Sequence, residues 1–360
     1  MKKILVVITT AFVKTGGLSS VMLNYWRSID KSGLSFDFAS SNVIDDVLNQ
    51  EITREGSRYF QLPPRKSIIS YFIQLKKICK GYNIIHVHAN SSTAIIELIA
   101  AKLAGVHKRI HHNHTSRSKY PLINTLLHPF FIRSLTCAVA CSDKAGEWLF
   151  GNGNFQILQN AINVDAFSYN PSARNEERLK YGIREDEVVV GHIGKFMDAK
   201  NHEFLIKIFA KYHCLNPKSK LLLVGDGIWR AKVEKWVLES GCPDAIILAG
   251  LCTNIPSIIQ SFDIFVFPSI YEGLPLTVLE AQAAGLPCLV SSNVTSSVNV
   301  GCDFLFLSIE ESAFTWASRI DALYSSMSRE KRCDVNRELL TKAGFNILNE
   351  ANKLRCLYDE

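Results

Sequence analysis

Residues 264–281 read IFVFPSIYEGLPLTVLEA and contain the three elements that decide the fold. The uninterrupted apolar run Ile264–Phe267 is typical of a strand that is buried on both faces of a sheet. Gly273 and Pro275 belong to a loop, and the residues from Leu276 onward follow the spacing of a helix. A buried strand, a loop and a helix in this order predict one unit of a parallel sheet covered by helices.

The same alternation of short apolar runs and longer amphipathic segments extends along the whole chain. In the first half, strands are predicted at Ile4–Ile8, Ile84–Val87, Arg109–His112 and Cys137–Ala140, with helices at Ser19–Ile29 and Ser67–Lys80. In the second half, strands are predicted at Val188–Ile193, Lys220–Val224, Ala245–Leu248 and Ile264–Phe267, with helices at Glu203–Tyr212, Ile228–Ser240, Ile255–Gln260 and Leu276–Ala284. The pattern predicts two doubly wound α/β domains of the Rossmann type.

The length of 360 residues fits two domains joined by a short hinge. The strand and helix periods are lost between Asn160 and Asn175, where asparagine, proline and serine supply turn residues. We therefore predict an N-terminal domain over residues 1–165 and a C-terminal domain over residues 166–335. Residues 336–360 follow as one polar helical segment, whose thin apolar face we expect to pack back across the domains.

The composition excludes several classes of protein. Hydrophobic residues make up 47% of the chain and charged residues 21%, which is incompatible with a disordered or low-complexity chain. The ten cysteines include no C-x-x-C pair, so we expect neither a disulfide framework nor a zinc site. No apolar run approaches the ~18 residues of a membrane span, and the first residues lack the pattern of a cleaved leader. We expect a cytoplasmic protein with reduced thiols.

Charge is distributed unevenly along the chain. Residues 1–165 contain 19 Lys and Arg residues and 10 Asp and Glu residues, a net charge of +9, so the remaining residues carry −3. Many of the basic residues lie between Lys76 and Arg133, where aromatic residues are interspersed, but no recognised nucleic-acid module accompanies them. We do not expect nucleic acid as a partner. Two interpretations of the basic half stay open: a solvated face that confers solubility, or a face for an anionic membrane surface.

The loop and helix after Ile264–Phe267 carry the first candidate site, because ligands of parallel α/β sheets bind at the carboxyl ends of the strands. The free N–H groups of the helix start near Leu276 suit an anion such as a diphosphate. The carboxylates of Glu272 and Glu280 can accept hydrogen bonds from the vicinal hydroxyls of a sugar or a ribose. In a simpler interpretation, Glu272 complements the helix dipole and Glu280 is a solvated surface residue.

This stretch resembles the E-x7-E signature of the retaining family-4 glycosyltransferases of the GT-B fold, which are the group 1 type of bacterial polysaccharide biosynthesis. Gly194–Lys200 is similar to the G-R-x-x-x-x-K loop of that family, and Leu221–Gly227 and Asp263–Ser269 also fit its pattern. The matching motifs lie within residues 190–290. The resemblance implies two Rossmann-like domains that face a central cleft.

The resemblance also implies a role for each matching residue. Lys195 and Lys200 would contact the donor diphosphate, although Lys195 stands where the family usually has an arginine and lacks its bidentate fork. Glu280 would bind the ribose, and Glu272 would hold the transferred sugar. The donor site would be completed by Gly273, Leu274, Pro275 and Leu276. Since the lysines would balance the charge of the leaving diphosphate, the resemblance implies no metal and no cofactor besides the nucleotide-sugar co-substrate.

Two glycines in the first half, Gly16 and Gly17, follow the first predicted strand and precede a helix. They let the backbone approach a ligand closely, but they do not form the dinucleotide fingerprint G-x-G-x-x-G, which disfavours hydride chemistry. In the resembling family this loop borders the donor phosphates and the acceptor, so both glycines are candidate donor-binding residues.

Histidines lie at the ends of two predicted strands in the first half. We expect no metal at His111, His112 and His114, because adjacent strand residues point to opposite faces and no acidic residue accompanies them. The resemblance places one histidine at this strand end close to the reacting sugar. His114 is the preferred catalytic match and His112 is the alternative. At the other strand end, His88 is a further cleft candidate, whereas we expect His86 in the core.

Together with these features, the resemblance implies a retaining, metal-independent hexosyltransferase that uses a nucleotide-sugar donor, specifically a UDP-sugar. The acceptor would be a hydroxyl of a glycan or of a polyprenyl-diphosphate-linked saccharide in the biosynthesis of an exopolysaccharide or capsule, at the inner face of the plasma membrane. Two alternatives stay open. A UDP-sugar epimerase of the same fold would turn over without an acceptor, and a noncatalytic nucleotide-sugar-binding protein would release no nucleoside diphosphate.

Overall fold

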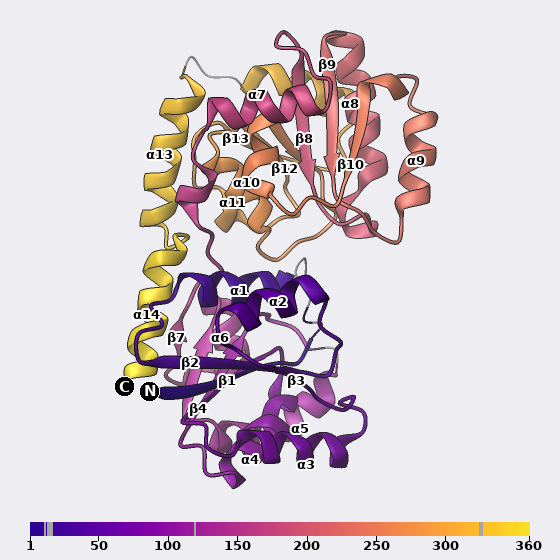
Figure 1. Ribbon diagram of the computed structural model, residues 1–360. Helices are drawn as coiled ribbons and strands as arrows, with labels where there is room; N and C mark the ends of the chain where they lie inside the picture. Colours follow the sequence, from indigo (N-terminus) through magenta and orange to yellow (C-terminus); the bar gives the residue numbers. More distant parts are fainter. Residues whose placement is uncertain (11, 13–16, 119, 324–326) are drawn as a thin grey trace. The chain divides into compact units, whose positions relative to one another are not determined.

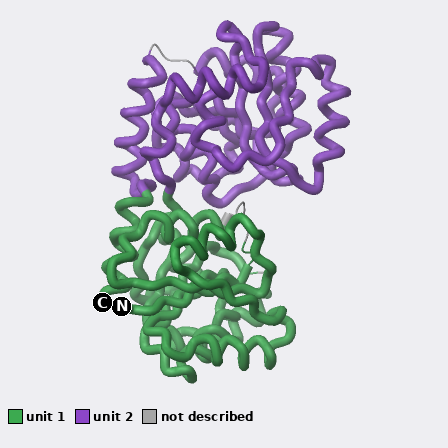
Figure 2. Tube along the Cα trace, in the orientation of Figure 1, with its two compact units in different colours: residues 1–161, 347–360 green, residues 162–346 purple. Residues whose placement is uncertain are grey.

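The chain is described by a computed structural model that covers residues 1–360 except 11, 13–16, 119 and 324–326 (Figure 1). It divides into two compact units (Figure 2). Unit 1 comprises Met1–Ala161 and Ile347–Glu360, and unit 2 comprises Ile162–Asn346. None of the helices in the described part of the chain has the length and apolar character that crossing a membrane requires.

Unit 1 is built on a seven-stranded parallel sheet with the order β3-β2-β1-β4-β5-β6-β7. Its strands are β1 (Lys2–Ile8), β2 (Leu34–Ser40), β3 (Tyr59–Gln61), β4 (Ile84–Ala89), β5 (Lys108–Asn113), β6 (Cys137–Ala140) and β7 (Gln156–Ile157). Its helices are α1 (Gly17–Ser28), α2 (Asp46–Arg54), α3 (Ile68–Cys79), α4 (Ile95–Leu103), α5 (Pro121–Ser134), α6 (Asp143–Phe150) and α14 (Ile347–Asp359). Helices cover both faces of the sheet, so every residue from Ile4 to Ile8 in the interior strand β1 is buried.

Unit 2 is built on a six-stranded parallel sheet with the order β10-β9-β8-β11-β12-β13. Its strands are β8 (Val188–Ile193), β9 (Ser219–Val224), β10 (Ile246–Gly250), β11 (Ile264–Phe267), β12 (Cys288–Ser291) and β13 (Phe304–Leu307). Its helices are α7 (Pro171–Lys180), α8 (His202–Leu215), α9 (Arg230–Leu238), α10 (Ile255–Ile258), α11 (Leu276–Ala283), α12 (Ala313–Ile320) and α13 (Arg329–Lys342). The two parallel sheets confirm the predicted fold class.

The predicted strands are confirmed, and those at Cys137–Ala140, Val188–Ile193 and Ile264–Phe267 have the predicted bounds. Strand β2 escaped prediction because Asp37 interrupts its apolar run. The structure shows how this buried carboxylate is tolerated: it pairs with the guanidinium of Arg58, 2.7 Å away, and accepts a hydrogen bond from the hydroxyl of Tyr82.

The C-terminal segment differs from the single helix expected over residues 336–360. It forms two helices, α13 and α14, because the chain turns at Gly344, whose φ of +85° is unfavourable for other residues. The units accordingly divide after Asn346 instead of at residue 336. The other division lies after Ala161 instead of residue 165, since Ile162 and Val164 already belong to the core of unit 2.

Candidate functional site

The carboxyl edge of the unit 2 sheet brings two predicted residues into direct contact. Lys200, in the loop after β8, places its Nζ 2.6 Å from Oε1 of Glu272, in the loop after β11. The same ammonium lies 4.5 Å from the ring centroid of Phe267, the last residue of β11. Both side chains of the ion pair are largely buried, at 15% and 22% exposure, so this pair is screened less by solvent than a surface pair.

Backbone contacts hold the two loops of this pair together. The N–H of Ile270 donates to the carbonyl of Ala199 at 2.9 Å. The side-chain amide of Asn201 donates to the carbonyl of Pro268 at 3.2 Å, and Asn201 itself has a left-handed φ of 54°, which asparagine tolerates better than most residues. Lys200 therefore occupies a fixed turn, and its ammonium is positioned before any ligand binds.

Close packing of the β8 and β9 loops explains the glycines of both motifs. The N–H of Phe196 donates to the carbonyl of Asp226 at 2.9 Å. A Cβ atom added to Gly225 would lie 2.0 Å from the carbonyl oxygen of Gly194, and one added to Gly227 would lie 2.4 Å from that of Phe196. Only glycine permits this approach. Lys195 is exposed in this loop and forms no ion pair with any described residue.

The start of α11 offers hydrogen-bond donors to an anion. Pro275 occupies the N-cap position and provides no side-chain cap for the first turn of the helix. Two hydroxyls nearby in sequence, Ser269 Oγ and Thr277 Oγ1, are buried and have no hydrogen-bond partner within the described chain. Both hydroxyls were missed by sequence reasoning. Their positions in the sequence could have revealed them, because Ser269 follows β11 and Thr277 lies in the first turn of α11.

Glu280 lies on α11 between the buried residues Leu279 and Ala281 and is itself half-buried. Burial raises the pKa of its carboxyl to about 7, because the surroundings disfavour the charged form. It forms no ion pair with the residues described here, and no contact joins it to Glu272. A carboxyl whose pKa is raised in this way is a candidate functional group.

Three histidines of unit 1, His86, His88 and His112, lie on one face of β4 and β5, and His114 in the loop after β5 stacks against two of them. Nδ1 of His88 lies 2.9 Å from Nε2 of His114, and the ring of His112 stacks on that of His114 with a centroid distance of 4.2 Å. His111 points to the opposite face, where its ring centroid is 4.8 Å from that of Phe131. The predicted alternation of His111 and His112 is thus observed.

The preferred histidine, His114, is half-buried in the loop that follows β5. Burial lowers the pKa of His114 to about 4, so its imidazole is neutral near pH 7. Its neighbour His88 is more deeply buried and contacts His114 directly. His88 therefore supports the ring of His114 from the interior of the unit. Of the two glycines predicted in this half, Gly17 begins α1, and Gly16 lies outside the described residues.

The chain resembles known proteins over its whole length. The family description "Glycosyl transferases group 1" matches residues 173–338. A protein of Bacillus subtilis (strain 168), "Putative glycosyltransferase EpsF", is 30% identical over 96% of this chain and 93% of its own length. An Escherichia coli protein named "UDP-Gal:alpha-D-GlcNAc-diphosphoundecaprenol alpha-1,3-galactosyltransferase" is 29% identical over 81% of this chain and 79% of its own length.

Solved structures show the same architecture. The Anabaena protein Alr3699/HepE, crystallised in complex with UDP, superposes with a TM-score of 0.79 at 16% identity, and the match covers 100% of both chains. At this identity the likeness concerns the fold alone. Together with the two parallel sheets and the E-x7-E, G-K and G-D-G motifs, these matches show that the chain belongs to the group 1 glycosyltransferases, with the GT-B fold.

Proposed function

We propose that this glycosyltransferase transfers a hexose from a UDP-sugar to a hydroxyl of a lipid-linked saccharide, with retention of the anomeric configuration. The observation that carries the proposal is the Lys200–Glu272 pair at the carboxyl edge of β8 and β11, next in sequence to the start of α11. A cation, a carboxylate and free helix N–H groups are the groups that a sugar diphosphate requires. The UDP-dependent E. coli relative and the UDP complex of the Anabaena protein support the choice of nucleotide.

Each residue of this edge takes one part of the donor. Lys195, Lys200 and the N–H groups of Leu276 and its neighbours contact the diphosphate. The Glu272 carboxylate accepts hydrogen bonds from sugar hydroxyls, while its ion pair with Lys200 orients it. The carboxylate of Glu280 accepts hydrogen bonds from the ribose hydroxyls.

The transfer forms a bond between the acceptor oxygen and the anomeric carbon and breaks the bond between that carbon and the phosphate oxygen. The acceptor proton moves to the leaving phosphate on the same face of the sugar, which retains the configuration. Lys195 and Lys200 stabilise the two negative charges of the departing UDP without a metal ion. In unit 1, the neutral imidazole of His114 orients the reacting sugar or acceptor by hydrogen bonding.

A surface of unit 1 has the composition that a lipid-linked acceptor calls for. We name it the α3–α5 surface: it is defined by the exposed apolar residues Ile69 and Ile73 of α3 and Leu122, Leu126 and Phe130 of α5. Helix α4 packs against both α3 and α5, so these helices cover one face of the sheet (Figure 1). Exposed Lys77 and Arg133 lie on the same helices, and exposed Lys80 directly follows α3. We infer that this surface contacts an anionic membrane that holds the acceptor.

The test is a panel of nucleotide sugars, each screened first for a rise in Tm and then for release of the nucleoside diphosphate with and without polyprenyl-diphosphate-linked saccharides. The proposal predicts that a UDP-sugar stabilises the chain and that UDP release depends on the acceptor. Conversion of the UDP-sugar without an acceptor would identify an epimerase. Binding without UDP release across the whole panel would identify a noncatalytic protein.

A further inference from the structure

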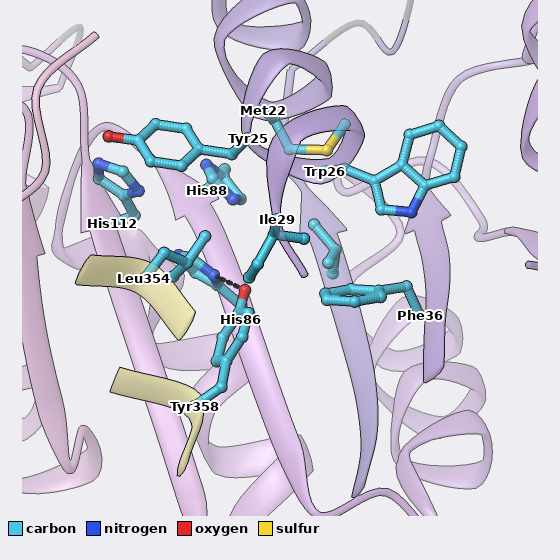
Figure 3. A pocket seen from close by; sticks show the side chains of 11 residues that line it. Met22, Tyr25, Trp26, Ile29, Phe36, His86, His88, His112, Leu354 and Tyr358 are labelled. Carbon is cyan, nitrogen blue, oxygen red and sulfur yellow. Dashed lines mark hydrogen bonds between the residues drawn. The ribbon is translucent and has the colours of Figure 1, made fainter. Parts of the chain in front are cut away.

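A small cavity of about 20 Å³ lies in unit 1 beneath α1 and α14 (Figure 3). Three imidazoles line it, those of His86 and His88 from β4 and His112 from β5, and apolar residues of α1 and α14 complete the wall. This volume accommodates about one water molecule or one ion. It is too small for a sugar or a nucleotide.

The three imidazoles lie close together, and their rings are stacked. One ring nitrogen from each of His86, His88 and His112 lies within 4.8 Å of the other two, and all three residues are at most 3% exposed. Strand register brings them together, because His88 pairs with His112 across β4 and β5, and His86 lies two residues before His88 on the same face.

Outer hydrogen bonds fix two of the rings. Nδ1 of His86 lies 2.6 Å from the hydroxyl of Tyr358 on α14, and Nδ1 of His88 lies 2.9 Å from Nε2 of His114. The Nε2 atoms of both rings thus remain for a further ligand. Metal-binding histidines are usually held in this manner, with the second ring nitrogen bound to a neighbouring polar group.

Several of the remaining nitrogens have no partner. Nε2 of His86 is buried without a hydrogen bond to any described residue, and the ring nitrogens of His112 have none beyond an interaction with the backbone of Leu158. Buried nitrogens without a partner are costly, and a bound cation would satisfy them.

We propose that His86, His88 and His112 bind one divalent late transition-metal ion, Zn²⁺ in the first place. Neutral imidazoles without a carboxylate select such ions over Mg²⁺ and Ca²⁺. Zn–N bonds of about 2.1 Å require the ligand atoms to approach to roughly 3.4 Å. The rings of His86 and His88 stack at a centroid distance of 4.3 Å, so both would rotate to direct a nitrogen at one ion. Adjacent histidines of a single strand point to opposite faces. The site arises because two strands contribute ligands to the same face.

This site is separate from the donor chemistry of unit 2 and does not depend on the proposed function. Its place in the fold is structural: the ion would tie β4 to β5, and through the Tyr358 hydroxyl it would hold α14 on unit 1. His88 would also be held with its Nδ1 toward His114.

The experiment uses the full chain without a histidine tag, stripped of metal with a chelator and then titrated with Co²⁺ as a spectroscopic probe and with Zn²⁺ in competition. We expect one ion per chain, visible d–d bands of a nitrogen-ligated Co²⁺, displacement by Zn²⁺ and a rise in Tm on Zn²⁺ addition. Each of His86→Gln, His88→Gln and His112→Gln is expected to weaken binding at least tenfold, and one well-folded variant suffices for the test. Tyr358→Phe keeps the packing and is expected to weaken binding by about tenfold.

The matched control is His111→Gln, because His111 is equally buried on the same strand but points to the opposite face. Unchanged binding in this variant, together with loss in the other three, would support the site. Absence of stoichiometric binding in the wild-type chain would overturn it. So would retained binding in a folded His112→Gln variant, or thiolate charge-transfer bands, which would assign the ion to cysteines.

Discussion

The two units place opposite kinds of chemistry on their parallel sheets. Unit 2 presents charged side chains, Lys195, Lys200 and Glu272, on loops whose backbones are fixed by hydrogen bonds and glycine contacts. Unit 1 presents uncharged imidazoles that stack on one another, such as His88 and His114. Unit 2 therefore carries charged side chains at the edge of its sheet, whereas unit 1 carries neutral imidazoles that interact by stacking and hydrogen bonding.

The largest effect is expected when the charge of unit 2 is removed. Lys200→Ala takes away a cation from the diphosphate and leaves the largely buried Glu272 without its partner. We expect kcat/KM for the nucleotide sugar to fall by about 100-fold or more, which corresponds to roughly 2.7 kcal/mol of transition-state stabilisation. The control is Lys207→Ala, since Lys207 pairs with Glu203 on the exposed side of α8. Equal rates for the wild type and Lys200→Ala would remove Lys200 from the donor site.

A smaller effect is expected in unit 1, where the lost group is uncharged. His114→Gln is expected to lower kcat by about tenfold, because a hydrogen bond between neutral groups is worth about 0.5–1.5 kcal/mol. With a pKa of about 4, His114 does not titrate between pH 6 and 8, so no change of rate in that range should depend on it. A step in the wild-type pH profile near 6.5 that disappears in His114→Gln would contradict this assignment.

The pH dependence of nucleotide-sugar binding tests the role of Glu280, a carboxyl of unit 2 whose pKa is raised to about 7. Ribose hydroxyls donate to the ionised form, so affinity for a nucleotide sugar should rise several-fold from pH 6 to pH 8. The diphosphate of the nucleotide sugar is esterified at both ends and does not titrate between pH 6 and pH 8. Glu280→Gln is expected to bind about tenfold more weakly with a flat pH dependence. An affinity that falls with rising pH would refute the ribose contact.

The same raised pKa has a consequence for stability. The folded chain retains a proton on Glu280 that the unfolded chain loses near its ordinary pKa of about 4.5. The contribution of this group to stability is therefore present at low pH and declines as the pH rises from about 4.5 to 7. Urea unfolding of the wild type and of Glu280→Gln at pH 5 and pH 8 measures how the free energy of unfolding depends on this group at each pH.

The smallest effect concerns the α3–α5 surface of unit 1. Leu126→Glu introduces charge at a side chain that is 73% exposed, so the fold should tolerate it. Binding to phosphatidylglycerol vesicles is expected to weaken a few-fold, and added salt should weaken wild-type binding as well. The matched control is Leu179→Glu on α7, where the leucine is 82% exposed in unit 2. Equal loss in both variants would show that the effect is not specific to this surface.

Much of the fold of unit 2 could be predicted from the sequence, because its strands and motif loops are encoded by local spacing. Glu272, Pro275 and Glu280 belong to a single strand–loop–helix stretch, and the glycines of the β8 and β9 loops signal close backbone contact. The Lys200–Glu272 pair could not be predicted in the same way, since it joins loops that are distant in sequence and adjacent in the sheet.

Unit 1 was less predictable for the same physical reason. The face shared by His86, His88 and His112 depends on the register of β4 against β5, which no local spacing reveals. The partner of His86, Tyr358, comes from the far end of the chain. The break at Gly344 that returns α14 to unit 1 was also missed, because the apolar spacing on either side of it continues as in a single helix.

The most direct test of the central claim is proton NMR of the reaction in a buffer without added Mg²⁺ or Mn²⁺, with a UDP-sugar and a lipid-linked saccharide. The account predicts that UDP accumulates and that the anomeric proton of the donor is replaced by one of the same configuration in the product. A product of the opposite configuration, a requirement for added Mg²⁺ or Mn²⁺, or a sugar altered while still attached to UDP would contradict it.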